Sequence, residues 1–346
     1  MKILFLTIGD ITVASTRARV YGYLPFLSEK NIRFRIISYT SGAKCKRVIN
    51  LKEDNPAERA FEIAYKIYAL VGLFLFAAIY DTVFIQKVIL PKRIWSILRL
   101  INKNIIFDFD DALYLYRDMS YVLRDSEAVV VSNSYLKNFV SKYNRRIHEL
   151  ISPVDVHRKK PGKDGKFITI GWTGSPETSR YLYPLCAVLR RLSEKFGSLN
   201  IEFMGIGDNE DFKSCGVKKT DWSIEGEKNY LAKVDIGIMP LEADEWSQSK
   251  AGYKLLLFMS YGIPCVASPV GVNSQIVEDG VNGYLANTED EWTRKMASLI
   301  EDENLRARLG EEAIKTVEKI YSYDANFSKF YDVLRVSETI NKENRI

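Results

Sequence analysis

Residues 235–273 read DIGIMPLEADEWSQSKAGYKLLLFMSYGIPCVASPVGVN, and this stretch decides the fold. Short apolar runs stand near both of its ends, at 235–241 and 263–268, and each is bounded by proline or glycine. Such runs fit fully buried strands of a parallel sheet. Between them, apolar residues recur at helical spacing over residues 253–260. The stretch therefore predicts a strand, a helix and a second strand, the repeating unit of a doubly wound α/β domain.

The entry to this helix, residues 247–252, is polar and contains a glycine. The first backbone N–H groups of a helix have no partner within it, so such an entry attracts anions. Lys250 and Lys254 are four residues apart, which predicts that they share one helical face at the crevice where a doubly wound sheet binds its ligand. A diphosphate fits this site, although two solvated surface lysines are the alternative. The other contacts predicted at this entry are Ser249, Gly252 and Tyr253.

Strand-like runs alternate with helical segments along the whole chain, whose 346 residues exceed what one hydrophobic core usually supports. This alternation predicts an α/β protein of two doubly wound parallel-sheet (Rossmann-like) domains that face each other across a cleft. Between them, residues 152–166 carry the prolines, glycines and charges typical of a linker. The predicted strands are 3–7, 34–38, 82–86, 105–109, 128–132, 168–171, 201–205, 236–240, 265–268 and 283–286.

Several stretches of the chain match one known family in order and spacing. They are TRARVYGYLPFL at 16–27, IIFDFDDALY at 105–114, IGWTGSPETSRYL at 170–182, and, between 240 and 284, PLEADEW, KAGYKLLLFMSYGIPCVASPVGVN and VNGY. Together they resemble the retaining glycosyltransferases of family 4, also called group 1.

The resemblance implies a glycosyltransferase-B fold. It also implies transfer of a sugar from a UDP- or GDP-sugar to a glycan or lipid-linked acceptor, with retention of configuration. No cofactor and no essential metal are implied, so the diphosphate leaving group would be stabilised by fixed positive charge and backbone donors. The predicted division is an acceptor-side domain at 1–151, a linker at 152–166, a nucleotide-sugar-binding domain at 167–321, and, at 322–346, a helix crossing back to the first domain plus a tail.

The sequence departs from the family pattern at the donor site. Ser249 and Leu257 stand where the family has two glutamates, and Trp172 with an SPET turn stands where an arginine and a lysine are usual. We infer that Lys250 and Lys254 take over the phosphate-binding charge, leaving the ribose without an assigned partner. Backbone and hydroxyl hydrogen bonds are predicted from the loop Thr173, Gly174 and Ser175.

The region that often lines the nucleobase in this family follows another predicted strand end. Gly205 closes that strand, and Trp222 comes later in the same region. Trp222 is predicted to stack on the base, with core or interface packing as the alternative.

The first domain brings three carboxylates to the end of the predicted strand 105–109. Asp108 and Asp110 alternate onto one side of an extended chain, and Asp111 follows. Such a cluster is costly unless it binds a ligand or faces a basic neighbour. Asp110 or Asp111 is predicted to orient or deprotonate the acceptor hydroxyl. The alternatives are a Mg²⁺ site, against which the resemblance argues, and a helix cap at Asp111.

The loop after the first strand carries further acceptor-side candidates. Arg17 is predicted to pair with an acceptor phosphate or with one of the carboxylates at 108–111. A surface position for Arg17 is the alternative. The remaining candidates in this loop are Gly9, Asp10 and Thr16.

Charge is divided unevenly along the chain. Residues 1–150 hold 23 Lys and Arg against 14 Asp and Glu, a net of +9, while the rest holds 26 against 30, a net of −4. The basic half predicts an anionic partner. Nucleic acid is disfavoured because no recognised module is visible and the basic residues are dispersed. An anionic membrane surface is the better candidate, and a basic cluster suits it: Lys44, Lys46, Arg47 and Lys52.

An uncharged run beside this cluster, residues 67–80, is 14 residues long, shorter than a bilayer requires. It is predicted to form a buried helix or, alternatively, a helix that dips into a membrane interface. The four cysteines share no metal-type spacing and indicate reduced thiols of a cytosolic protein. We therefore expect a cytoplasmic protein, with the inner face of the plasma membrane as a candidate location and residues 1–10 as a first strand rather than a signal peptide.

Two further functions remain open. A catalytically silent nucleotide-sugar-binding or scaffold protein would explain the loss of both glutamates, and a sugar-nucleotide epimerase would keep the fold. An epimerase relies on acid–base side chains, often histidine, and only His148 and His157 are present. The sequence favours a glycosyltransferase of cell-surface polysaccharide or glycolipid synthesis.

Overall fold

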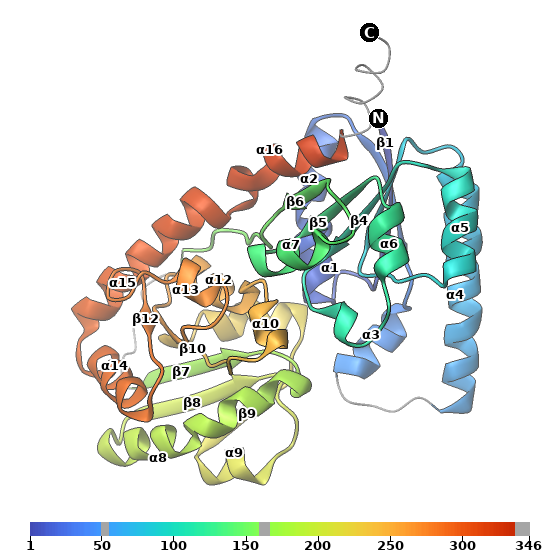
Figure 1. Cartoon of the computed structure of the whole chain (residues 1–346). Helices are drawn as coiled ribbons and strands as arrows, with labels where there is room; N and C mark the ends of the chain where they lie inside the picture. Colours follow the sequence, from blue (N-terminus) through green and yellow to red (C-terminus); the bar gives the residue numbers. More distant parts are fainter. Residues whose placement is uncertain (50–54, 159–166, 336–346) are drawn as a thin grey trace.

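The computed structural model describes residues 1–49, 55–158 and 167–335, which form two six-stranded sheets (Figure 1). The strands of the first sheet are β1 (Lys2–Thr7), β2 (Arg33–Ser38), β3 (Thr82–Gln86), β4 (Ile105–Phe109), β5 (Ala128–Val131) and β6 (Ile147–Glu149). Those of the second are β7 (Ile168–Thr173), β8 (Leu199–Met204), β9 (Val217–Thr220), β10 (Ile236–Met239), β11 (Cys265–Ala267) and β12 (Tyr284–Leu285).

Both sheets are parallel and doubly wound. The N-terminal sheet has the order β2-β1-β3-β4-β5-β6, and the C-terminal sheet has the order β12-β11-β10-β7-β8-β9. The order reverses between β1 and β3 in the first sheet and between β7 and β10 in the second. At such reversals, ligands bind outside the carboxyl ends of the strands. The predicted fold class is confirmed.

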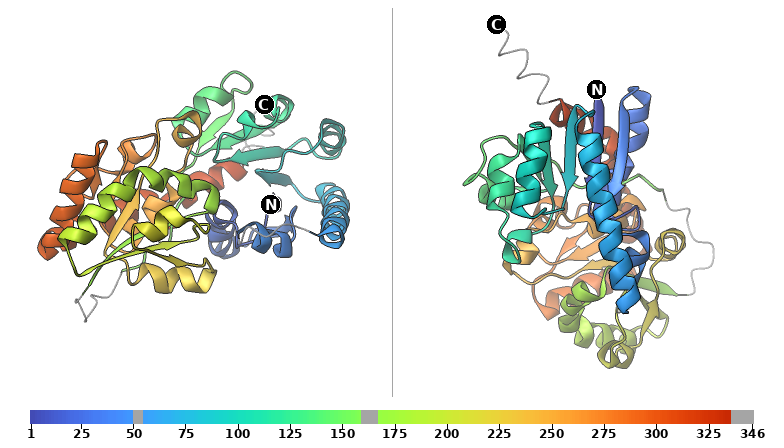
Figure 2. Two further views of the ribbon diagram at one scale, coloured as in Figure 1. Left: turned by 90° about the horizontal axis from the view of Figure 1, so that it is seen from below. Right: turned by 90° about the vertical axis from the view of Figure 1, so that its right-hand side faces the viewer.

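Helices cover both faces of each sheet (Figures 1 and 2). In the N-terminal half they are α1 (Ala14–Arg19), α2 (Leu24–Glu29), α3 (Gly42–Ile49), α4 (Pro56–Ala77), α5 (Lys92–Ile101), α6 (Ser120–Asp125) and α7 (Ser134–Val140). In the C-terminal half they are α8 (Cys186–Lys195), α9 (Glu210–Ser214), α10 (Ile224–Leu231), α11 (Glu245–Gln248), α12 (Tyr253–Ser260), α13 (Asn273–Ile276), α14 (Glu289–Glu301), α15 (Glu303–Thr316) and α16 (Tyr323–Leu334). Shorter 3₁₀ segments lie at Tyr21–Tyr23, Leu113–Leu115 and Pro176–Leu185, and a π-helical turn lies at Val317–Tyr321.

The last helix, α16, packs against the first sheet rather than the second (Figure 1). Val154 and Ser322 form a β-bridge where the outgoing and returning segments meet. Beyond it, the rings of Tyr23 and Phe330 stack with centroids 4.0 Å apart, and Tyr323 donates a hydrogen bond to the Ala18 carbonyl at 3.2 Å. The predicted boundaries of domains, linker and tail stay a proposal, and residues 159–166 and 336–346 lie outside the described residues.

The uncharged run at 67–80 falls largely within α4, and its outward half is not buried. Ala69, Leu73 and Ala77 pack inward, whereas Ile67 and Leu75 are 58% and 66% exposed. The buried-helix interpretation is therefore wrong for the outward half. Among the described residues, α4 is the helix long and apolar enough to cross a membrane by length and composition. Of the predicted basic cluster beside it, the side chains of Lys46 and Arg47 and the whole of Lys52 lie outside the described part of the chain.

Candidate functional site

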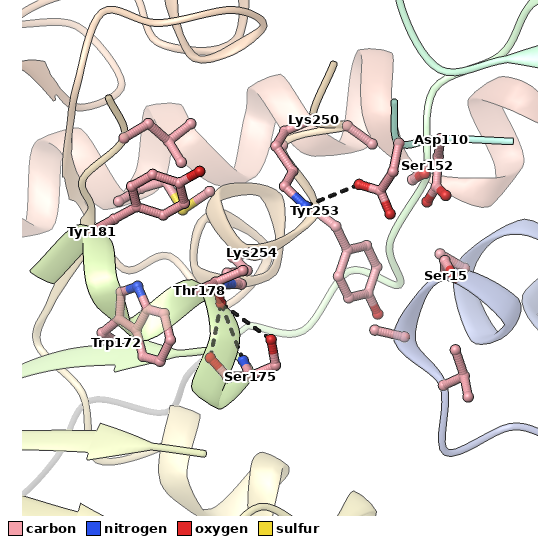
Figure 3. A pocket seen from close by; sticks show the side chains of 18 of the residues that line it. Ser15, Asp110, Ser152, Trp172, Ser175, Thr178, Tyr181, Lys250, Tyr253 and Lys254 are labelled. Atoms are coloured by element: carbon pink, nitrogen blue, oxygen red, sulfur yellow. Dashed lines mark hydrogen bonds and ion pairs between the residues drawn. The ribbon is translucent and has the colours of Figure 1, made fainter. Parts of the chain in front are cut away.

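The cleft between the two sheets holds two adjoining cavities of about 340 and 480 Å³. Their walls come from segments that follow the carboxyl ends of β1, β3, β4, β7 and β10, so both domains contribute. Figure 3 shows side chains of the smaller cavity. The residues that line both cavities are Val13, Ala14, Ser175, Thr178, Lys250, Tyr253 and Lys254.

Helix α12 forms the C-terminal wall of this cleft. Its residues 255–260 are all buried, and Gly252 precedes it with a φ of 70°. A Cβ at Gly252 would lie 3.0 Å from the Val272 side chain and would also touch Ile276, so only glycine fits this left-handed turn. Because α12 begins at Tyr253, Lys250 is not on it. The prediction that Lys250 and Lys254 share one helical face is wrong, although both residues line the same two cavities.

Lys254 is the cation at the centre of this wall. Its Nζ donates a hydrogen bond to Thr178 Oγ1 at 2.8 Å and lies 4.3 Å from the ring centroid of Trp172. Figure 3 shows Lys254 beside Thr178 and Trp172. Burial, and next the charge of Lys250, lower the pKa of Lys254 to about 7. In the part of the chain that the structure describes, no carboxylate forms an ion pair with it.

Lys250 and Lys87 neutralise the acidic cluster from opposite domains. Lys87 follows β3 in a left-handed conformation with a φ of 60°, and its Nζ lies 2.7 Å from Asp110 Oδ1 and also pairs with Asp111. Lys250 Nζ donates to the other oxygen of Asp111 at 3.0 Å. Burial alone would raise the pKa of Asp111, but the two ammonium groups outweigh it and hold that pKa well below its usual range. The cluster thus faces basic neighbours, and Asp111 does not cap the following 3₁₀ segment.

Asp108 forms its ion pair with Arg19 and not with Arg17, the arginine predicted from the sequence. Arg19 Nε donates to the two oxygens of Asp108 at 2.9 and 2.8 Å, and Arg19 Nη1 donates to the Leu150 carbonyl at 2.9 Å. Arg17 instead reaches across the cleft, where its Nη2 lies 3.1 Å from Glu227 Oε2. The predicted pairing of Arg17 with a carboxylate at 108–111 is therefore wrong.

Glu227 on α10 is a site residue that sequence reasoning missed. It accepts hydrogen bonds from Arg17 and, at 2.7 Å, from Trp222 Nε1. It lines the larger cavity together with Trp222 and Leu257. The only signal in the sequence was an acidic residue five positions after Trp222. Lys87 was missed as well, because a lone lysine after an apolar strand has no special pattern.

Three predicted contacts are used inside the protein and line neither cavity. Thr16 Oγ1 donates to Gln86 Oε1 at 3.0 Å, and Ser249 Oγ, fully buried, accepts from Ala112 N at 2.9 Å. Gly205 has a φ of 79°, and a Cβ there would collide with the carbonyl of residue 174. The contacts of these residues are internal to the protein, and we assign them no ligand contact.

The loops that follow β1 and β7 also form hydrogen bonds within the protein. Asp10 accepts a hydrogen bond from Thr12 N at 2.9 Å, and neither Gly9 nor Asp10 lines a cavity. Gly174 N donates to the Met204 carbonyl at 3.1 Å, and Ser175 N donates to Thr178 Oγ1 at 3.3 Å. These two backbone donors, predicted for phosphate, are already engaged. Thr173, Gly174, Ser175 and Thr178 still line the larger cavity. Because Thr178 Oγ1 already donates to the Ser175 carbonyl at 3.0 Å, the hydroxyl groups of Thr173 and Ser175 are the remaining candidate donors.

The carboxylates show no grouping suited to a metal. Within the described ranges, no group of three or more His, Cys, Asp and Glu side chains is placed to hold an ion. Lys87 and Lys250 occupy the positions beside Asp110 and Asp111 that a cation would take.

Two Rossmann-like domains, a ligand cleft between their strand ends and a last helix that returns to the first domain define the glycosyltransferase-B fold. Residues 166–302 match the family model described as Glycosyl transferases group 1. This match covers the C-terminal half of the chain and agrees with the family resemblance seen in the motifs. The whole chain shares its fold with solved glycosyltransferase structures.

Individual relatives are distant in sequence. N-acetyl-alpha-D-glucosaminyl L-malate synthase of Bacillus anthracis is 24% identical over 249 residues, which is 68% of this chain but only 55% of that protein. The structure of Anabaena Alr3699/HepE in complex with UDP-glucose aligns over 99% of this chain and 100% of its own, with a TM-score of 0.69 and 15% identity. TarM aligns over 77% of this chain and 58% of its own, with a TM-score of 0.60 and 14% identity.

Proposed function

We propose that the protein is a retaining, metal-independent glycosyltransferase of the hexosyltransferase type. It moves a sugar from a UDP- or GDP-sugar to a glycan or lipid-linked acceptor in the cytoplasm, during synthesis of cell-surface polysaccharide or glycolipid. The observation that carries this proposal is Lys254, a desolvated ammonium group in the interdomain cleft with no carboxylate ion pair among the described residues. Such a group gains most from a ligand that brings negative charge.

The donor diphosphate lies between Lys254 and Lys250 in this proposal. The hydroxyl group of Ser175 faces the same space and donates a hydrogen bond to a phosphate oxygen, while Thr178 Oγ1 accepts from Lys254 and holds it in place. During transfer the bond between the anomeric carbon and the diphosphate breaks, so negative charge grows on the leaving oxygen. Fixed cations at that position stabilise the transition state more than the bound donor.

Asp110 is the better candidate of the two acidic residues for contact with a sugar hydroxyl. Both oxygens of Asp111 are engaged by lysines, and its pKa is held low, which makes it a poor base. Asp110 has one ion pair, to Lys87 at 2.7 Å, and it lines the smaller cavity. We assign Asp110 to orient the acceptor hydroxyl and to accept its proton as the acceptor oxygen bonds to the anomeric carbon and the diphosphate leaves.

The nucleoside occupies the larger cavity in this proposal. Trp222 offers its indole ring to the base, and Glu227 accepts hydrogen bonds from the ribose hydroxyls. Leu257 stands where the family has one of its glutamates, and Glu227 lines the same cavity from α10. A carboxylate supplied by a neighbouring helix thus substitutes for the missing one, while Arg17 holds it from the acceptor side.

The complex of HepE with UDP-glucose supports a uridine donor as the first to test. The protein is incubated with UDP, GDP and their hexose conjugates, with and without EDTA, and melting temperature and donor hydrolysis are recorded. We expect one nucleotide to raise the melting temperature and its sugar conjugate to be hydrolysed slowly without metal. No stabilisation by any nucleotide would contradict the proposal, and activity abolished by EDTA would contradict metal independence.

A catalytically silent nucleotide-sugar-binding protein is the second candidate. The presence of Ser249 and Leu257 at the two glutamate positions favours it. The same panel separates the two, because a silent protein is stabilised by the nucleotide sugar but releases no nucleotide over hours, with or without glycan and lipid-linked acceptors.

A further inference from the structure

An apolar surface covers the outside of α4 and α5, which contact each other over one face of the N-terminal sheet (Figures 1 and 2). We call it the α4–α5 face. The residues that define it are Ile63, Ile67, Val71 and Leu75 on α4 with Ile97 and Leu100 on α5, each half exposed or more and Leu100 at 84%. Soluble proteins rarely leave such a contiguous stripe of large aliphatic side chains uncovered.

Beyond its first turn, which carries the exposed Arg59, α4 turns its charges away from this face. Residues 60–79, all within the described part of the chain, contain only Glu62 and Lys66 as charged residues. Glu62 is buried and accepts from the Ser41 hydroxyl at 2.6 Å, and the ammonium of Lys66 lies 5.5 Å from the ring of Tyr39. A surface helix of a soluble protein has its charges outside and its apolar stripe inside. Here the outward face is apolar over several turns.

Positive charge borders the α4–α5 face. Four basic residues lie on or just beyond α5, namely Lys92, Arg93, Arg99 and Lys103, and the single acidic residue of the range 63–104 is Asp81. Lys92 and Arg93 at the start of α5 and Lys103 just beyond its end are exposed. Asp81 lies 3.8 Å from the terminal amino group and accepts from Lys2 N at 2.6 Å. The border is therefore suited to an anionic surface.

We propose that the α4–α5 face docks on an anionic lipid bilayer, with α4 lying in the plane of the interface. Apolar side chains then enter the acyl boundary while the bordering lysines and arginines meet anionic headgroups. A second copy of the chain fits this face less well. In a two-fold symmetric dimer, the basic residues that border the face in one copy would meet the same basic residues of the other copy and repel them.

Docking in the plane is favoured over crossing the bilayer. The inward side of α4 belongs to the protein: Leu73 and Ala77 pack in the sheet core, and Glu62 is hydrogen-bonded to Ser41. A spanning orientation would have to expose Glu62 and Lys66 to hydrocarbon and strip Leu73 from the core. Docking requires none of these contacts to break, and it depends on no step of the proposed transfer reaction.

The test is co-sedimentation of the protein with sonicated vesicles of phosphatidylcholine alone or of phosphatidylcholine with 30% phosphatidylglycerol. The variant Ile67→Glu/Val71→Glu/Leu75→Glu places three carboxylates on the α4–α5 face. The matched control, Val281→Glu/Ile320→Glu, changes exposed aliphatic residues of the C-terminal half, which are 38% and 47% exposed. We expect wild type and control to bind the anionic vesicles, and the α4 variant to bind at least tenfold more weakly.

A third variant, Lys92→Gln/Arg93→Gln/Lys103→Gln, should bind neutral and anionic vesicles equally. Unchanged melting temperature and donor hydrolysis in the α4 variant establish that it is folded. Failure of the wild type to sediment with either vesicle, or equal binding by wild type and α4 variant, would overturn the proposal. It would also be overturned if wild type without vesicles elutes as a dimer that the α4 variant loses, because the face would then belong to a second copy.

Discussion

Lys87 and Lys254, one cation from each domain, reach the cleft in opposite states. On the N-terminal side, Lys87 is saturated by Asp110 and Asp111, so that wall carries charge already balanced within the protein. On the C-terminal side, Lys254 rests on an aromatic ring and a hydroxyl, and its pKa is lowered to about 7. The difference indicates two roles. The N-terminal wall, whose charges are paired within the protein, suits neutral sugar hydroxyls, and the C-terminal wall, where Lys254 has no carboxylate partner among the described residues, suits a diphosphate.

The largest expected effect is that of Lys254→Ala. Removing one fixed donor that stabilises developing charge typically costs about 10²–10³ in kcat, and we expect a loss of that order in donor hydrolysis together with weaker UDP binding. The matched control is Lys233→Ala, which removes an exposed lysine of the same domain. Turnover within about twofold of wild type in the Lys254 variant would place the diphosphate elsewhere and contradict the proposed role of the C-terminal wall.

Asp110→Asn tests the role of the N-terminal wall in binding the acceptor. The amide keeps the shape, and Lys87 keeps its pair with Asp111, so the fold should persist. We expect kcat for transfer to fall about 10²-fold because a hydroxyl-orienting carboxylate is lost, while the Kd of UDP changes less than about threefold. Isothermal titration and initial rates measure the two separately, with the exposed Asp125→Asn as the control. If UDP binding weakened as much as turnover, the two walls would not be separate in function.

The sequence predicted the strands whose residues are apolar and missed those whose residues are not. The ten predicted strands are all present within a few residues of their expected bounds. The two missed strands, β6 and β9, lie at the sheet edges and read IHE and VKKT. These two edge strands are short and carry polar residues, so they give no continuous apolar run. The other two edge strands, β2 and β12, contain enough apolar residues to be recognised.

The sequence predicted the site residues that lie in recognisable motifs, but not those whose positions depend on tertiary contacts. Lys250 and Lys254 line both cavities, as expected for a shared site. They do not share a helical face, however, because the left-handed Gly252 separates Lys250 from α12. Glu227 depends on how α10 meets the opposite domain, and Lys87 depends on a positive φ after β3. Both depend on packing between segments far apart in sequence, which no local pattern encodes.

Glu227→Gln tests the nucleoside end of the cleft. A hydrogen bond to a charged group contributes about 1.5–3 kcal/mol, so wild type should prefer UDP over 2′-deoxy-UDP roughly ten- to hundredfold. We expect the variant to lose most of this preference while binding 2′-deoxy-UDP as wild type does. Competition titrations with the two nucleotides measure it, and Glu225→Gln, an exposed acid on the same helix, is the control. A preference unchanged in the Glu227 variant would assign the ribose to another partner.

The smallest expected effect is a proton taken up when UDP binds. Because the pKa of Lys254 is lowered to about 7 in the free protein, the group is roughly nine-tenths neutral at pH 8, and an arriving diphosphate raises that pKa and restores the charge. Titration at pH 8 in buffers of different ionisation enthalpy should therefore show close to one proton bound in wild type and none in Lys254→Ala. The same shift fixes the sign of its effect on folding: the unfolded chain binds more protons between about pH 7 and 10.5, so this group's contribution to stability rises with pH across that window. Binding enthalpies that do not depend on the buffer would show that Lys254 is charged before the donor arrives, and the contrast with Lys87 would then lie in pairing alone.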